Sequence, residues 1–292
     1  MVQAKRDVWL TEWRIRMSRS TALAVFRVFL LIGLSVYITV IQGLTLLLRL
    51  PFARQLPVHW HGWCCRAIGM QVIVSGCPLV SGPALFVSNH VSYIDIAALG
   101  SVVDASFISR ADVRGWPVFG FLATLQRTIF IEREPRYARQ QMRELSDRLA
   151  MGDRLILFPE GTSSDGNAIL PFKSSLFAAA EIEVNGKPVQ IQPISLAYTR
   201  IDGIPLGRLS RPIYAWYGEM EFAPHFWHML GFGRFRVEFT LHNPVTLDQF
   251  ASRKELTQYC ERVVTSGFSR ALSGRTEHKL ETAPAVDIPS TA

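Results

Sequence analysis

The sequence feature that most constrains the fold is an apolar run without any charged residue, from Val28 to Leu48. A helix needs about 20 predominantly apolar residues to cross the hydrocarbon core of a bilayer, and this run is long enough to do so. It is too long for the apolar core of a signal peptide, and no small-residue cleavage site follows it. A helix that is apolar all round is not stable in water, so we expect it to contact a membrane.

Positive charge on both sides of the run leaves its orientation open. Arginines precede it and follow it, at Arg14, Arg16, Arg19, Arg27, Arg49 and Arg54. The orientation of a membrane helix follows an excess of Lys and Arg on one side, and these flanks give no clear direction. Two arrangements are therefore open: a helix that crosses the bilayer, and a helix that enters one leaflet with both ends on the cytoplasmic side.

The segments on either side of the run have the composition of structure at a membrane surface. Residues 1–20 mix basic and aromatic side chains, which is typical of an interfacial segment, and a solvated tail is the alternative. Residues 51–70 carry Trp60 and Trp63 and predict an amphipathic helix with its tryptophans at the level of the lipid headgroups. Residues 1–70 are therefore predicted to form a basic N-terminal segment and a two-helix membrane mount.

Composition and charge favour the same class of protein. The chain has 292 residues, of which 49% are hydrophobic, and a formal net charge of +7. The length suits one large domain with an appendage, and the hydrophobic share is high for a soluble enzyme. Positive charge suits either a nucleic acid or an anionic membrane surface. The sequence contains no nucleic-acid-binding motif, so we expect the membrane as partner and no nucleic acid.

The cysteines give no sign of a metal or redox site. Cys64, Cys65, Cys77 and Cys260 have neither metal-ligand spacing nor a Cys-x-x-Cys pair. Their thiols are compatible with the reducing cytosolic side of a membrane. Because no zinc, haem or dinucleotide motif occurs either, we expect neither a metal nor a bound cofactor.

The residues best suited to chemistry follow a short buried strand predicted at residues 84–87. His90 and Asp95 come next, and a helix is expected from residue 96, so a base and a carboxylate lie where a strand passes into a helix. A neutral histidine can accept a proton from an alcohol, and a carboxylate on its other ring nitrogen fixes the tautomer. The alternative is that His90 only caps the helix and Asp95 is a solvated acid of the first turn.

A second strand end carries the sequence Pro159-Glu160-Gly161-Thr162. An apolar strand is expected over residues 154–158, and the proline and glycine break it. Taken alone, this sequence predicts a turn that ends a strand.

Together and in this order, Asn89-His90-x4-Asp95 and the Pro-Glu-Gly-Thr sequence resemble motifs of the glycerolipid acyltransferase family. This family is typified by the bacterial 1-acylglycerol-3-phosphate acyltransferases, and the resemblance covers about residues 60–245. It implies an α/β fold in which a mixed sheet is flanked by helices, with an N-terminal membrane-anchoring helical motif.

The resemblance also implies a division of the chain and a reaction. We expect an acyltransferase catalytic domain over residues 71–273. The polar composition of residues 274–292, with Pro284 and Pro289, predicts a disordered tail. His90 would remove the proton of an acceptor hydroxyl, Asp95 would orient His90, and the oxygen would attack an acyl thioester without an acyl-enzyme. Acyl carrier protein or coenzyme A would carry that thioester. The remaining candidates are expected to bind substrate: Asn89, Arg133, Glu160, Gly161, Thr162 and Lys173.

Some of these residues have more specific expected roles. Arg133, at the end of a strand, would bind the polar head of the acceptor. Glu160 would hydrogen-bond acceptor groups or order its loop, and Gly161 would present its N–H to the developing oxyanion. Lys173 is expected at the pocket edge. Arg127 stands where the family usually has glycine, and we expect it to add a second positive group facing the head group.

The acceptor is predicted from the residues that follow the Pro-Glu-Gly-Thr sequence. Many family members with a phosphate-bearing acceptor have arginine there, whereas residues 163–166 read Ser-Ser-Asp-Gly. A phosphomonoester usually recruits bidentate arginines. We therefore favour lyso-ornithine lipid, a zwitterion whose hydroxyacyl chain bears the acceptor hydroxyl. The alternative is 1-acyl-sn-glycerol-3-phosphate, because Arg127, Arg133 and Lys173 can still bind a phosphate.

The sequence thus predicts a lysolipid O-acyltransferase on the cytoplasmic face of a bacterial-type cell inner membrane. Its expected partners are membrane lipids, the lysolipid acceptor, and an acyl carrier protein or coenzyme A thioester. A hypothesis from another class is a non-catalytic lipid-binding membrane protein that uses the same apolar groove. The presence of His90, Asp95, Glu160 and Arg133 argues against it, because a binder needs no base.

Overall fold

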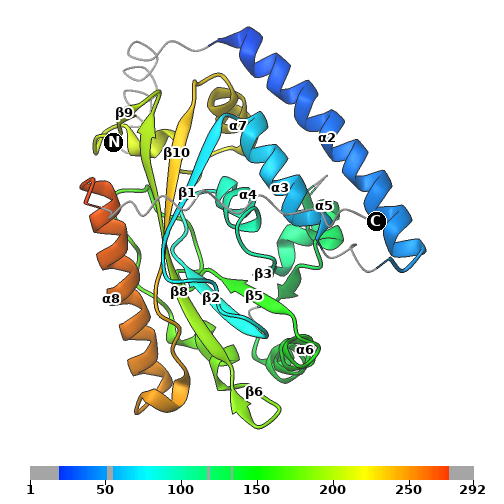
Figure 1. The fold of residues 1–292 in the computed structure, drawn as a ribbon, viewed down its shortest axis with the longest axis vertical. Helices are drawn as coiled ribbons and strands as arrows, with labels where there is room; N and C mark the ends of the chain where they lie inside the picture. The colour runs from blue at the N-terminus through cyan, green and yellow to red at the C-terminus, as the bar shows by residue number, and fades with distance from the viewer. Residues whose placement is uncertain (1–19, 51–54, 117–118, 133, 276–292) are drawn as a thin grey trace, which may run out of the picture.

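The centre of the molecule is a mixed β-sheet with helices on both faces (Figure 1). The structure is a computed structural model that describes residues 20–50, 55–116, 119–132 and 134–275. The strands run in the order β1-β10-β8-β2-β5-β3-β4, and the short β9 pairs with β8. β10 and β8 are antiparallel, and all other neighbours in this order are parallel. The bounds are β1 Met70–Gly76, β2 Ala84–Ser88, β3 Ser106–Arg110, β4 Ile129–Ile131, β5 Arg154–Leu157, β8 Gln190–Ile201, β9 Ile204–Pro205 and β10 Phe235–Leu241, and a separate pair is β6 Glu183–Val184 and β7 Lys187–Pro188.

The helices connect the strands and cover the sheet. The α-helices are α2 Thr21–Leu47, α3 Leu56–Ala67, α4 Ile94–Gly100, α5 Phe119–Leu125, α6 Ala138–Ala150, α7 Phe222–Leu230 and α8 Arg253–Leu272. Short 3-10 helices are η2 Ala111–Gly115, η3 Pro135–Tyr137, η4 Ser174–Glu181, η5 Arg211–Ile213 and η6 Leu247–Gln249.

The sequence of strand β2 is apolar throughout because the strand lies in the centre of the sheet. All of its residues are buried, because the strand lies between β8 and β5 with helices on both faces. Side chains alternate across a strand, so Ala84 and Phe86 join the hydrophobic cluster of α3, α4 and α7. Leu85 and Val87 join the cluster of α6, η4 and α8 on the opposite face. This two-faced burial fixes the position of the residues that follow β2.

The predicted fold class is confirmed. Between β3 and β4 the chain forms η2, which ends at Gly115, and α5, which begins at Phe119; Pro117 separates them in the sequence, and proline lacks a backbone donor. Residues 202–233 contain the helix α7. Of the expected interfacial segment, residues 1–20, positions 1–19 lie outside the described residues. Of the expected tail, residues 274–292, positions 276–292 lie outside them.

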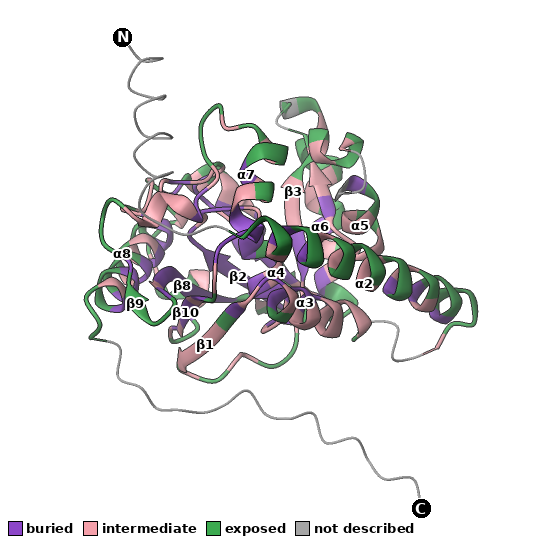
Figure 2. Ribbon diagram, turned by 90° about the horizontal axis from the view of Figure 1, so that it is seen from above, coloured by how far each residue is buried: buried purple, intermediate pink, exposed green. Residues whose placement is uncertain are grey.

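Helix α2 contains the apolar run and packs on the domain by one face. It is long and apolar enough to cross a membrane, and it is the one helix in the described ranges with both properties. Its buried residues are Ala24, Arg27, Ile38, Gln42 and Thr45, which recur on one side of the helix. The opposite face is exposed along its length, as the green outer surface in Figure 2 shows. The exposed residues include Phe26, Phe29, Ile32, Val36, Val40, Leu44 and Leu47.

Polar and aromatic contacts hold α2 against the domain. The Arg27 guanidinium, 5% exposed, donates to the carbonyls of Leu230 and Phe232 at the end of α7, at 2.9 and 2.5 Å. Helix carbonyls at a C-terminus lack intrahelical donors, so a cation there is favourable. Further along α2, the rings of Tyr37 and Trp63 lie 6.1 Å apart and join α2 to α3. The two helices predicted as a membrane mount therefore pack on each other and on the domain.

Candidate active site

The parallel pairing of β2 and β5 brings the two sequence motifs to the same edge of the sheet. Val87 is in register with Leu157, so the residues after each strand leave the sheet side by side. The backbone N–H of His90 donates to Oε1 of Glu160 at 2.7 Å, which joins the two strand ends directly. The site is thus at the carboxyl edge of parallel strands, where α/β folds generally place their sites.

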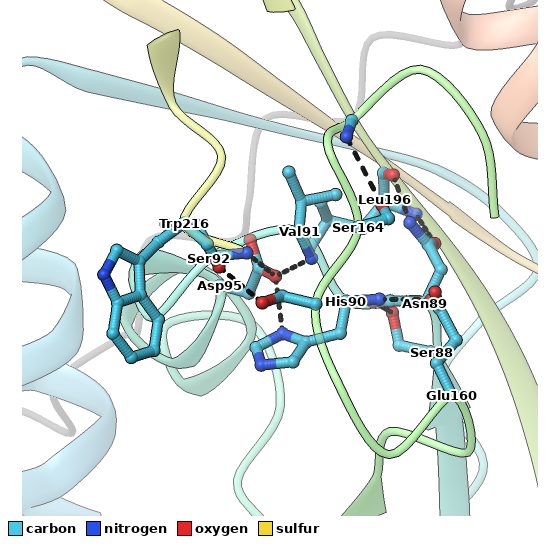
Figure 3. A network of polar contacts seen from close by, with 12 residues as sticks. Ser88, Asn89, His90, Val91, Ser92, Asp95, Glu160, Ser164, Leu196 and Trp216 are labelled. Atoms are coloured by element: carbon cyan, nitrogen blue, oxygen red, sulfur yellow. Dashed lines mark hydrogen bonds and ion pairs between the residues drawn. The ribbon is translucent and has the colours of Figure 1, made fainter. Parts of the chain in front are cut away.

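His90 and Asp95 are in direct contact at this edge (Figure 3). Nδ1 of His90 lies 2.8 Å from Oδ2 of Asp95, and the same oxygen accepts from the N–H groups of Val91 and Ser92 at 2.7 and 2.8 Å. Asp95 is fully buried at the start of α4, where the helix N-terminus favours a negative charge. A carboxylate with these donors keeps the proton of His90 on Nδ1 and leaves Nε2 to accept another.

Tyr198 completes the environment of Asp95, and sequence reasoning missed it. Its hydroxyl donates to Oδ1 of Asp95 at 2.6 Å, and its side chain is 3% exposed. Burial beside the Asp95 carboxylate raises the pKa of Tyr198 well above its ordinary value, so the phenol remains a donor. Tyr198 lies on β8, far from both motifs in the sequence. The only sequence signal for its role is a hydroxyl-bearing side chain within an apolar strand.

The imidazole ring of His90 is also fixed on its face. It stacks on the ring of Phe158 at a centroid distance of 4.1 Å and an interplanar angle of 16°. The His90 side chain is 20% exposed, so the ring is held in the protein and still open to a substrate. The ring can therefore exchange a proton without having to move.

Glu160 orders the loop rather than standing free in the site. It is 1% exposed, and its two oxygens accept from the N–H groups of His90 and Leu170 at 2.7 and 2.9 Å. Burial raises the pKa of Glu160 to about 8, against the opposing effect of these two backbone donors. Of the two roles expected for Glu160, these contacts correspond to loop ordering, and its contact with an acceptor stays a prediction.

The polar groups of Asn89 and Gly161 are both used within the fold. The Asn89 amide donates to the carbonyl of Leu196 at 2.9 Å and accepts from its N–H at 2.8 Å, which joins the end of β2 to β8. Gly161 has φ 70°, a conformation that favours glycine. Its N–H donates to the carbonyl of Phe158 at 3.1 Å, so in this structure it closes the turn instead of facing an oxyanion.

The remaining candidates lie around the same turn or outside the described residues. Thr162 and Lys173 are exposed, and the backbone N–H of Lys173 donates to the carbonyl of Pro159 at 2.9 Å. Both side chains are therefore at the rim of the edge that carries His90. Arg133 lies outside the described residues. The substrate-binding roles of Asn89, Arg133, Thr162 and Lys173 stay predictions.

The expectation for Arg127 was wrong. Its guanidinium pairs with Asp153 at 2.8 Å, and Arg148 pairs with the same carboxylate. Arg127 precedes β4, and Asp153 precedes β5, so the pair lies at the amino edge of the sheet, away from His90. A residue before a strand and a residue after it lie at opposite edges, so Arg127 cannot share a head-group site with residues that follow β4.

A cavity of about 590 Å³ lies at the amino edge beneath α2. Its lining comes from α2, α3 and the segments before β2, β3 and β5, and includes Thr45, His61, Ser106, Arg127 and Arg154. None of the residues of the His90 site lines it. The volume of this cavity therefore gives no information on the substrate at His90.

Comparison with known proteins identifies the family. The acyltransferase family profile matches residues 62–197. Lyso-ornithine lipid O-acyltransferase of Rhizobium meliloti (strain 1021) is 41% identical over 273 residues, 90% of this chain and 94% of that protein. The Brucella abortus (strain 2308) protein of the same name is 40% identical, over 85% of this chain and 96% of its own.

A solved structure has the same fold. The 1-acyl-sn-glycerophosphate (LPA) acyltransferase PlsC from Thermotoga maritima aligns with a TM-score of 0.60 at 24% identity, over 85% of this chain and 94% of that one. At this identity the likeness concerns the fold alone. The two relatives, with the family profile, show that this chain belongs to the acyltransferase family.

Proposed function

We propose that this chain is a lyso-ornithine lipid O-acyltransferase. It moves a fatty acyl group from an acyl thioester, carried by acyl carrier protein or coenzyme A, to the free hydroxyl of the lysolipid. The single observation that carries the reaction type is the contact of His90 Nδ1 with the buried Asp95 carboxylate at 2.8 Å. The names of relatives about 40% identical over most of the chain support the choice of acceptor.

In the proposed mechanism, Nε2 of His90 takes the proton of the acceptor hydroxyl as the oxygen attacks the thioester carbonyl. Asp95 stabilises the imidazolium that forms. The tetrahedral intermediate then expels the thiolate, which takes the proton from His90. An ester bond forms, a thioester bond breaks, and no acyl-enzyme is needed. A general base of this kind contributes about 100- to 10,000-fold to the rate.

Helix α2 supports a proposed position in the membrane. Its outer face is apolar and exposed, whereas its inner face packs on the domain near both ends, through Arg27 and Thr45. A helix that crossed the bilayer would carry those contacts into the hydrocarbon, so we propose that α2 lies in one leaflet with both ends on one side. The acyl carrier protein and coenzyme A thioesters are cytosolic, which supports the cytoplasmic face of the inner membrane.

Turnover by the purified enzyme tests the proposal. Protein in detergent is given an acyl carrier protein or coenzyme A thioester with either lyso-ornithine lipid or 1-acyl-sn-glycerol-3-phosphate, and ester formation is measured by mass spectrometry. We expect turnover of lyso-ornithine lipid and a loss of at least about 100-fold in His90→Ala. The control His59→Ala, on α3, retains activity.

Three results would count against the proposal. Turnover of the phosphate acceptor alone would favour the phosphatidate-forming alternative. Binding of lipid without turnover of any thioester would favour a non-catalytic lipid-binding protein. Activity of His90→Ala within a few-fold of the unmodified enzyme would exclude His90 as the base.

A further inference from the structure

Asp165 and Arg211 are held close together by a shared amide side chain. The two carboxylate oxygens of Asp165 accept from the backbone N–H and the side-chain Nδ2 of Asn167, at 2.9 and 3.1 Å. Nη1 of Arg211 donates to Oδ1 of the same Asn167 at 3.3 Å. No direct ion pair joins Asp165 to Arg211 in the described part of the chain. One amide side chain thus bridges a carboxylate and a guanidinium that form no ion pair with each other.

Arg211 has a donor that the described residues do not satisfy. Its Nε is buried and has no hydrogen-bond partner among them. Burial lowers the pKa of Arg211, Arg208 lowers it further, and Asp165 raises it. A buried donor without an acceptor destabilises the folded protein. The guanidinium also has two terminal nitrogens, from which a ligand carboxylate can accept two hydrogen bonds.

This charge pair is one loop away from the candidate base. The N–H of Ser164 donates to the carbonyl of His90 at 2.9 Å. Gly166 lies between the two sites, since a Cβ on it would be 3.3 Å from Cγ1 of Val91 and 3.7 Å from Cβ of Arg211. The same loop therefore contacts the base on one side and carries the charged pair on the other.

We propose that Asp165 and Arg211 form the subsite for the zwitterionic head group of the acceptor. This inference rests on the proposed function. In a hydroxyacyl amino-acid lipid, the carboxylate and the ammonium are several bonds from the hydroxyl, so the head group binds beside the base and not at it. The carboxylate accepts from Arg211, and the ammonium donates to Asp165. A phosphomonoester has no ammonium to offer Asp165 and is repelled by it, which gives the pair selectivity.

The test uses acceptors in which one charge is removed at a time. Initial rates are measured over acceptor concentration with lyso-ornithine lipid, its carboxyl methyl ester, and its side-chain N-acetyl derivative. For the unmodified enzyme, we expect each derivative to raise KM about tenfold, the size of one charge-assisted hydrogen bond. In Arg211→Gln, KM for the parent lipid rises about tenfold, and the methyl ester gives no further increase.

Asp165→Asn gives the complementary result. Its KM for the parent lipid rises about tenfold, the N-acetyl derivative gives no further increase, and the methyl ester still does. Arg211→Lys keeps the charge and recovers part of the affinity. Arg270→Gln on α8 removes the same charge on a helix that does not carry the site and leaves every KM unchanged.

A loop that is merely braced by these residues gives a different pattern. In that case each variant raises KM by the same factor for all three lipids, and this result overturns the subsite. Unchanged KM values in both variants overturn it too. A third result is distinct from these two. If the unmodified enzyme does not acylate lyso-ornithine lipid at all, the proposed function itself is refuted.

Discussion

The hydroxyl of Tyr198 donates a hydrogen bond of 2.6 Å to Oδ1 of Asp95, the carboxylate oxygen that His90 does not use. The carboxylate is therefore held from both ends, by a phenol on β8 and by an imidazole and two backbone N–H groups after β2. The orientation of His90 thus depends on Tyr198, which lies well outside the sequence motif that contains His90 and Asp95.

Tyr198→Phe is expected to lower kcat about tenfold, because hydrogen bonds to charged groups are worth about 1.5–3 kcal/mol. With one donor lost, Asp95 holds the protonated imidazole more tightly, so the acidic limb of the rate–pH profile moves to higher pH. Steady-state rates over pH measure both effects.

Tyr214→Phe is the matched control, since its ring stacks on that of Tyr198 at 5.7 Å in the same core. The Tyr214 hydroxyl is buried with no hydrogen-bond partner among the described residues, so its removal should be neutral or stabilising. An unshifted pH profile in Tyr198→Phe would show that the phenol acts only in packing.

Glu160 should make the stability of the protein fall as pH rises from about 5 to 8. Burial raises its pKa from 4.5 to about 8, so within this range the folded protein holds a proton that the unfolded chain has released. Raising the pH therefore favours the unfolded chain. Glu160→Gln is less stable at each pH, because an amide offers one acceptor oxygen to two N–H donors, but it lacks this slope. The difference between the thermal unfolding midpoints of the two proteins should shrink with rising pH, and parallel curves would contradict the assignment.

Arg27→Met should loosen α2 from the domain. The substitution keeps an apolar stem but leaves the carbonyls of Leu230 and Phe232 without their buried donor. We expect a loss of about 3 kcal/mol in unfolding free energy, measured by denaturation in detergent. Arg262→Met, on the exposed side of α8, should change it by less than about 0.5 kcal/mol. Equal losses in both variants would mean that Arg27 has no special role.

Both ends of α2 should be labelled from the cytoplasmic side. In a Cys77→Ser background the other native thiols, Cys64, Cys65 and Cys260, are buried. Ser20→Cys and Leu48→Cys then place one thiol before and one after α2. In inside-out membrane vesicles a membrane-impermeant maleimide should modify both.

Asp248→Cys on η6 is the control for this labelling experiment, because its modification shows on which side of the membrane the catalytic domain lies. A helix that crosses the bilayer would give one labelled end in inside-out vesicles and the other in right-side-out vesicles.

The parts of this structure that were predictable from sequence are those set by local pattern. An apolar run followed by turn residues identified β2 and β5, and the spacing of His90 and Asp95 put both at a helix start. Contacts between distant strands were not predictable. Tyr198 reaches Asp95 only because β8 lies beside β2 in one register, which no local pattern specifies.

Some polar groups are used by the fold in ways that no local pattern specifies. The Gly161 N–H and the Asn89 amide were expected at substrate; each has a backbone partner that single-sequence reasoning cannot see, and their substrate roles stay predictions. Arg127 was misplaced for a related reason. Its charge was recognised, but the acid that neutralises it, Asp153, comes from another strand end.

The contact between Arg27 and the end of α7 has a consequence for how substrate arrives. The other end of α7 carries Phe222, whose ring lies 4.8 Å from that of Tyr93, two residues before Asp95. The anchor helix is thus joined through one short helix to the turn that holds the base. In the proposed one-leaflet position of α2, this connection would set the height of the imidazole above the acyl chains. A lysolipid would then rise only until its hydroxyl reached that height, and its tail would stay in the bilayer throughout the reaction.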